Sequence, residues 1–173
     1  MSTRIDFSTL GLMDALDLAF LIEKEAYQRY LKFAAQFGIE GPERPGHFFR
    51  SMAENEAKHG EEIAKRRDAM FGTTPSQVSL DDLFDVEAPE EGAIRRTMSV
   101  LQAFQVGIAA EQKAYDFYDQ ALKHITDPEV HKLFIELRDE ETEHVQLLRD
   151  HMEKLPPSAS IEGEINYDET PYL

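Results

Sequence analysis

Apolar residues recur at steps of three and four along four segments of the 173-residue chain, and this spacing is typical of amphipathic helices. The segments span about residues 10–37, 46–71, 89–125 and 128–155. No segment shows the alternation of apolar and polar residues that is typical of a half-buried strand. The sequence therefore predicts an all-α fold built from four long helices.

Capping and turn residues mark the ends of these segments. Glycines and prolines between residues 38 and 46 end the first segment, and a single glycine ends the second. Pro89, which is followed by two acids, predicts the first turn of the third helix. Asp127, which is followed by a proline, predicts the N-cap of the fourth helix. We expect Ser8 or Thr9 to cap the first helix.

The connection between the second and third segments is long. It holds about 16 residues, 73–88, whereas antiparallel neighbouring helices need only about 2–8. A helix of 26 residues, such as the second segment, is about 39 Å long, and an extended linker of this length can travel back along it. We therefore expect two antiparallel helical hairpins joined by a long crossover. Residues 1–155 would form this bundle, and residues 156–173 an extended acidic tail.

The two halves of the chain repeat one pattern. Residues 23–30 and residues 111–118 both read Glu-x-x-Ala-Tyr-x-x-Tyr. The second helix of each half carries Glu-x-x-His, at residues 56–59 and 141–144. These matches indicate an internal duplication of a helical hairpin.

Six polar residues interrupt the apolar stripes of the four helices: Glu23, Glu56, His59, Glu111, Glu141 and His144. A buried carboxylate costs several kcal/mol unless it is paired or ligates a metal. We find no Lys or Arg near the middle of the stripes, so an ion-pair network does not account for these acids. Two divalent cations would neutralise the four carboxylates, and a Glu and a His three residues apart project from the same face of a helix. The pattern predicts a dinuclear metal site with catalytic and metal-binding roles for all six residues; the alternative is a satisfied polar core without metal.

Composition excludes several classes of protein. The chain has 18 Lys and Arg against 34 Asp and Glu, a formal net charge of −16, which disfavours nucleic acids and anionic membranes as partners. Cysteine is absent, so disulfides, thiolate catalysis and iron–sulfur clusters are excluded. No apolar run is long enough to span a bilayer, and the first residues contain no hydrophobic signal region. We therefore expect a cytoplasmic protein.

The motifs at 23–30 and 56–59 resemble the first hairpin of the rubrerythrins, which are dinuclear iron proteins of the ferritin-like superfamily. The resemblance covers about residues 10–155 and implies a ferritin-like four-helix bundle with two iron ions. Oxygen and imidazole donors also suit manganese or a mixed Mn/Fe pair. The resemblance divides the six polar residues between the ions: Glu56 and Glu141 as bridges, Glu23 with His59 on one ion, and Glu111 with His144 on the other. It also implies that Tyr30 and Tyr118 hydrogen-bond ligand carboxylates; packing in an aromatic core is the alternative.

The activity implied by the resemblance is that of an oxidoreductase. A di-ferrous centre would reduce hydrogen peroxide or dioxygen and protect the cell from oxidative stress. Rubrerythrins usually carry a further iron site built from cysteines, and this chain has none, so a separate electron-donor protein is expected. Ala114 stands where rubrerythrins have an additional ligand Glu, which weakens the assignment as a peroxidase but leaves the metal site intact. We also expect a homo-oligomer, a dimer or larger.

Three other functions remain open at this point. The first is a ferroxidase that stores iron in a hollow shell, and the second is an oxygenase acting on an aldehyde or fatty acyl chain. The third is an interaction module whose tail, residues 158–173, docks on a partner. The acids that flank the six residues would form a solvated face, with attraction of iron toward the site as the alternative role: Glu54, Glu61, Glu62, Glu140 and Glu143.

Overall fold

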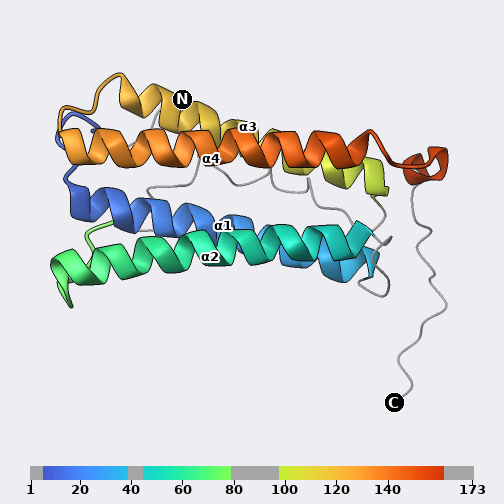
Figure 1. Ribbon diagram of the computed structural model, residues 1–173, viewed down its shortest axis with the longest axis horizontal. Coiled ribbons are helices and arrows are strands. Elements are labelled where there is room, and N and C mark those ends of the chain that lie inside the picture. The colour runs from blue at the N-terminus through green and yellow to red at the C-terminus, as the bar shows by residue number, and fades with distance from the viewer. Residues whose placement is uncertain (1–5, 39–44, 79–97, 162–173) are drawn as a thin grey trace, which may run out of the picture.

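The computed structural model describes residues 6–38, 45–78 and 98–161. Within these ranges the chain folds into four long helices and one short 3-10 helix, with no strand (Figure 1). The elements are α1 Leu12–Phe37, α2 Pro45–Phe71, α3 Val100–Leu122, α4 Pro128–Met152 and η2 Pro157–Ser160. The all-α prediction is confirmed, and none of the described helices is long and apolar enough to cross a membrane.

The helices form two antiparallel hairpins, α1 with α2 and α3 with α4 (Figure 1). In Figure 1, α2 ends at the end of the bundle where α1 begins, whereas α3 begins at the opposite end. The chain therefore crosses the length of the bundle between Phe71 and Val100. This single long crossover is the topology of the ferritin-like four-helix bundle, as the sequence predicted.

The start of the third helix differs from the prediction. α3 begins after Ser99 rather than at Pro89, because Ser99 and Gln102 form a reciprocal capping box. The backbone N–H of Gln102 donates to Ser99 Oγ at 3.2 Å, and the backbone N–H of Ser99 donates to the side-chain Oε1 of Gln102 at 2.8 Å. Pro89 itself lies outside the described residues. At the first helix, Gly11 rather than one of the preceding hydroxyl residues occupies the N-cap position.

The apolar core consists of two clusters, one toward each end of the bundle. Their large buried side chains include Leu16, Ile22, Phe117 and Phe134 in one cluster, and Phe33, Phe49, Phe104 and Leu148 in the other. On each of the four helices, the polar residues that interrupt the stripe lie between these two clusters. The fold thus encloses the polar positions between two apolar layers.

Large apolar side chains on the surface include those of Phe20 and Met70. Phe20 is 38% exposed and Met70 is 51% exposed. Phe20 lines an outer groove between α1 and α2, and Met70 lies in the last turn of α2, beyond the cluster around Leu16.

The beginning of the expected tail is folded. Residues Pro157–Ser160 form η2, which contacts α3, and Ala159 is buried. An extended tail was expected here. Burial of the apolar Ala159 side chain stabilises the folded segment instead. Residues 162–173 of the tail lie outside the described part of the chain.

Asp127→Ala should lower the free energy of unfolding by about 1 kcal/mol. The reason is that Asp127 Oδ1 accepts hydrogen bonds from the backbone N–H groups of Glu129 at 2.8 Å and of Val130 at 3.1 Å at the start of α4. For a chain of this size, Tm should fall by roughly 2–4 °C, as measured by thermal unfolding monitored by circular dichroism. Asp127→Asn keeps the acceptor oxygen and should retain most of the stability. An unchanged midpoint in Asp127→Ala would contradict the assigned cap.

Candidate metal centre

The six polar residues of the stripes meet at the middle of the bundle. α1 and α3 each supply one Glu, and α2 and α4 each supply a Glu-x-x-His pair whose members share one face of the helix. Five of the six are almost inaccessible to solvent: Glu23, Glu56, Glu111, Glu141 and His144, each 5% exposed or less. The side chain of His59 is 26% exposed. Four carboxylates are therefore removed from water at one place.

The most buried set of possible metal ligands consists of Glu111, Glu141 and His144. His144 Nδ1 lies 3.9 Å from Glu111 Oε2 and 3.8 Å from Glu141 Oε2. These distances are too long for hydrogen bonds. Two ligands bound at about 2.1 Å to one ion, however, can lie up to about 4.2 Å apart. The spacing therefore fits ligands that share a metal ion.

A second set lies toward the surface between α2 and α4 and consists of Glu23, His59 and Glu140. His59 Nδ1 lies 3.8 Å from Glu23 Oε2 and 3.8 Å from Glu140 Oε2. The structure thus brings Glu23 together with His59, and Glu111 together with His144, which are the pairs expected for the two ions.

Glu56 lies between the two sets. It forms a third possible ligand set with both imidazoles, and its Oε1 is 3.3 Å from His144 Nδ1. The imidazole rings of His59 and His144 are nearly parallel, with centroids 5.3 Å apart. This central position suits the bridging role expected for Glu56, whereas Glu141 is grouped with the His144 side.

Buried polar atoms at the centre have no hydrogen-bond partner within the described ranges. They are Glu56 Oε1, His59 Nδ1 and His144 Nδ1. Leaving such an atom unsatisfied costs about 1–3 kcal/mol, so native proteins rarely do so. Carboxylate oxygens with imidazole nitrogens are a donor set that suits iron and manganese. The residues present therefore fit a pair of metal ions.

A buried cation, Arg29, corrects the expectation that the stripes carry none. Its side chain is 2% exposed, and Nη2 donates to Glu111 Oε1 at 3.3 Å. The guanidinium carbon lies 5.3 Å from the centroid of the Tyr30 ring. Arg29 neutralises one of the four buried negative charges. When both histidines are neutral and all four acids are ionised, a net charge of three negative units remains at the centre.

The two predicted tyrosines are both fully buried. The Tyr30 hydroxyl donates a hydrogen bond to Glu111 Oε1, the same oxygen that Arg29 contacts. Burial and the charge of Glu111 raise the pKa of Tyr30 well above its usual value, so the hydroxyl keeps its proton as a donor. The Tyr118 ring packs edge-on against Phe117 and Phe134.

The groups of the cluster shift one another's pKa. Burial, together with the charge of Glu111, raises the pKa of Glu56 well above its usual value. Burial acts the same way on Glu111, but the neighbouring His144 and Arg29 outweigh it and lower the pKa of Glu111 to about 2. Burial works to lower the pKa of His144, but the surrounding carboxylates raise it to about 9. The raised pKa values favour the protonated forms of Glu56 and His144, which reduce the negative charge of the centre, and metal binding must displace such protons.

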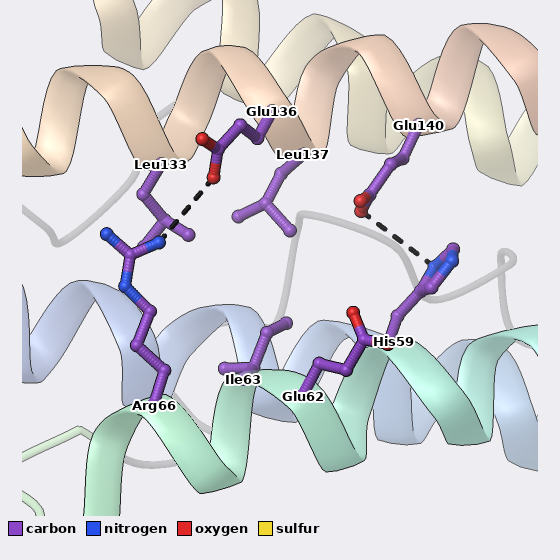
Figure 2. Close-up of a pocket in the computed structure, with 8 residues that line it drawn as sticks. All are labelled: His59, Glu62, Ile63, Arg66, Leu133, Glu136, Leu137 and Glu140. Carbon is purple, nitrogen blue, oxygen red and sulfur yellow. Dashed lines mark ion pairs between the residues drawn. The ribbon is translucent and has the colours of Figure 1, made fainter. Parts of the chain in front are cut away.

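A pocket of about 180 Å³ reaches the His59 side of the centre from the surface between α2 and α4 (Figure 2). Glu140, expected on a solvated face, is a half-buried wall of this pocket and points at His59. Burial raises the pKa of Glu140 and lowers the pKa of His59. In the sequence Glu140 lies beside Glu141, one residue off the stripe, and this position alone does not distinguish it from a solvated acid.

Two of the differences between the duplicated halves change the charge around the centre. Arg29 on α1 corresponds to Phe117 on α3, and Glu140 on α4 corresponds to Asn55 on α2. The His144 side consequently has a buried cation behind Glu111, and the His59 side has an additional carboxylate at a pocket. The centre is electrostatically asymmetric.

The rubrerythrin family model matches residues 14–152, which is most of the chain and includes all six residues. The chain belongs to the rubrerythrin family. A crystal structure of an uncharacterized conserved protein from Magnetospirillum magnetotacticum MS-1 is similar to this rubrerythrin-family chain, with a TM-score of 0.70 and 27% identity. The similarity covers 85% of this chain and 97% of that chain. No curated protein matches the sequence.

Membership in the rubrerythrin family agrees with the geometry of the centre. The family binds two iron ions, and this chain has two sets of Glu and His side chains with a carboxylate between them. Rubrerythrins are often oxidoreductases. The family and the donor set together identify the mid-bundle cluster as a candidate dinuclear metal centre.

Arg29→Met should destabilise the metal-free protein by about 3–5 kcal/mol, because it leaves Glu111 buried beside three further acids without its cation. Adding Glu111→Gln should recover a large part of the loss. Urea unfolding after removal of metal by a chelator measures both effects as a double-mutant cycle.

Arg50→Met is the matched control for Arg29→Met. Arg50 pairs with Glu54 on the surface, where both side chains are more than half exposed, so the change should cost less than about 1 kcal/mol. Equal effects of Arg29→Met and Arg50→Met would show that the buried pair has no special role.

Proposed function

We propose that the protein is a non-haem diiron oxidoreductase of rubrerythrin type that reduces hydrogen peroxide or dioxygen and protects the cell from oxidative stress. The observation that supports it is a buried cluster of four carboxylates and two imidazoles in a chain of the rubrerythrin family. Each helix contributes to this cluster, and the ligands of the two iron ions would be Glu23, Glu56, His59, Glu111, Glu141 and His144.

Two ferrous ions bound here would supply two electrons, which with two protons convert one hydrogen peroxide into two waters. The protein would fix the geometry of the ligands. Arg29 and Tyr30 both hold Glu111 Oε1, which leaves Oε2 directed toward His144. The apolar clusters on either side exclude water from the centre, and the pocket beside His59 is wide enough for a small oxidant.

The electrons must come from another molecule. The sequence has no cysteine, so no cysteine-ligated iron site in it can pass electrons to the centre. We propose a separate electron-donor protein, a homo-oligomeric assembly and a cytoplasmic location. Nucleic acid and membranes are not proposed as partners, because the net charge of −16 disfavours both phosphate backbones and anionic lipids.

A ferroxidase of iron-storage type is the second candidate. Ala114, fully buried on α3, stands where rubrerythrins have an additional ligand Glu, and the acidic pocket gives cations a route to His59. Storage requires a hollow shell of many subunits, so a native mass near that of a monomer or dimer would exclude it. An oxygenase is less well supported, because a pocket of about 180 Å³ lined by Glu62, Arg66 and Glu136 does not suit a long acyl chain.

The purified protein should bind two ferrous ions per chain under anaerobic conditions, and Glu56→Gln should bind one or none. Glu56 lies between both imidazoles, and Gln has nearly the same shape as the protonated Glu56 that burial favours, so the fold should be retained. Glu54→Gln is the matched control, because Glu54 lies on the same helix with a side chain 64% exposed. Metal analysis after gel filtration measures the stoichiometry. Two ions in Glu56→Gln would exclude Glu56 as a ligand.

Stopped-flow mixing of the ferrous-loaded protein with peroxide or with air-saturated buffer tests the choice of oxidant. If the protein is a peroxidase, equal concentrations of peroxide should oxidise the ferrous ions at least about tenfold faster than dioxygen, a difference of about 1.4 kcal/mol in the barrier. Absorbance follows the oxidation, and Glu54→Gln serves again as control. Oxidation by peroxide no faster than by oxygen would count against the peroxidase and favour the ferroxidase.

A further inference from the structure

The pocket between α2 and α4 has a different character at its two ends (Figure 2). At one end, Arg66 pairs with Glu136, with Nη1 3.5 Å from Oε2. At the other end, Glu140 and His59 face each other across the gap between the helices. Ile63 and neighbouring leucines line the stretch between these ends. The pocket is thus an apolar stretch with an ion pair at one end and, at the other, a carboxylate that faces the imidazole of His59, whose pKa burial lowers.

The charges in the pocket favour a cation at the His59 end. Three carboxylates and one guanidinium line it, and Arg66 is engaged by Glu136 and also by Glu129 at 3.9 Å. Glu62 and Glu140 lie toward the opposite end, near His59. Clefts lined by one sign of charge raise the local concentration of the opposite ion, so divalent cations are drawn to this end of the pocket.

The geometry at that end fits coordination better than a hydrogen bond. His59 Nδ1 is a buried atom without a hydrogen-bond partner within the described ranges. It lies 3.8 Å from Glu23 Oε2 and 3.8 Å from Glu140 Oε2, which exceeds hydrogen-bond length but fits ligands of one ion. Glu23 is almost fully buried, whereas the Glu140 side chain is 40% exposed. Glu140 can therefore contact both the solvent in the pocket and the donors of the centre.

We propose that Glu140 is a seventh ligand of the centre, which takes a divalent cation from the pocket and shares it with His59 and Glu23. This inference rests on the proposed function, in which the Glu and His side chains hold two metal ions. The ion at the His59 side is consequently the exchangeable one. The ion at the His144 side is held by Glu111, Glu141 and His144, which are 5% exposed or less.

The duplication supports a role specific to Glu140. Its counterpart in the first half is Asn55, so only the second half has a carboxylate at this position. Other acids near the pocket do not have its position: among the described residues, Glu140 is the flanking acid that joins a possible ligand set. Glu143, which lies three residues after Glu140 on the same face of α4, is exposed.

The experiment measures binding of Mn²⁺ to the full chain after removal of metal by a chelator. Equilibrium dialysis should give two ions per wild-type chain, one bound more weakly and released faster to added chelator. Glu140→Gln should weaken the second ion by about 10–100-fold and leave the affinity of the first within about twofold. Glu143→Gln removes the same charge from the surface of α4 and should behave as the wild type. Circular dichroism confirms that each variant is folded.

Glu140→Asp separates coordination from simple attraction, because it keeps the charge but shortens the side chain by one methylene. Coordination requires Glu140→Asp to weaken the second ion nearly as much as Glu140→Gln does. Wild-type affinity in Glu140→Asp or in Glu140→Gln would overturn the proposal, and so would equal weakening of both ions. Failure of the wild type to bind any Mn²⁺ or Fe²⁺ would instead overturn the proposed function, so the two failures are distinguishable.

Discussion

The burial of four carboxylates at one height of a helical bundle is the constraint on which the rest of this structure depends. Each ion would cost several kcal/mol in an apolar interior without a partner. Within the described residues, the guanidinium that pairs with one of these four acids is that of Arg29. The long helices fix the carboxylates in place, and apolar clusters above and below keep water away. The shortfall in positive charge is what makes a pair of divalent cations the natural complement of the fold.

The helices could be predicted from the sequence because their apolar residues recur at steps of three and four. The six central residues could be predicted because each is a polar residue at a position of that pattern where an apolar residue is expected. Arg29 was missed for a geometric reason. The buried surface of α1 also includes Ile22, Ala26 and Phe33, because a helix in a bundle packs against more than one neighbour. Arg29 follows this second line of positions at steps of three and four, and a single narrow stripe leaves it outside.

Glu140 could not be separated from its exposed neighbours for a related reason. Adjacent residues on a helix point about 100° apart, so Glu140 lies beside the stripe that contains Glu141, as many solvated acids do. Only the packing of α2 opposite α4 brings His59 to face it. The start of α3 differs from the prediction for another reason. The acids after Pro89 are typical of a first helical turn, but the capping box of Ser99 and Gln102 sets the N-terminus of α3 at Val100.

The helix that supplies a seventh carboxylate decides on which side of the centre ligands and metal ions can exchange. A Glu at the position of Ala114 would come from α3, inside the apolar cluster that contains Phe117 and Phe134, and would be shielded from solvent. Glu140 comes from α4 and lines a pocket open to the surface. If Glu140 coordinates the ion at His59, ligand exchange, metal loading and contact with a small oxidant all take place on one side of the molecule. The Arg29 side would then remain a fixed point, since Glu111 is held there by both the guanidinium and the Tyr30 hydroxyl.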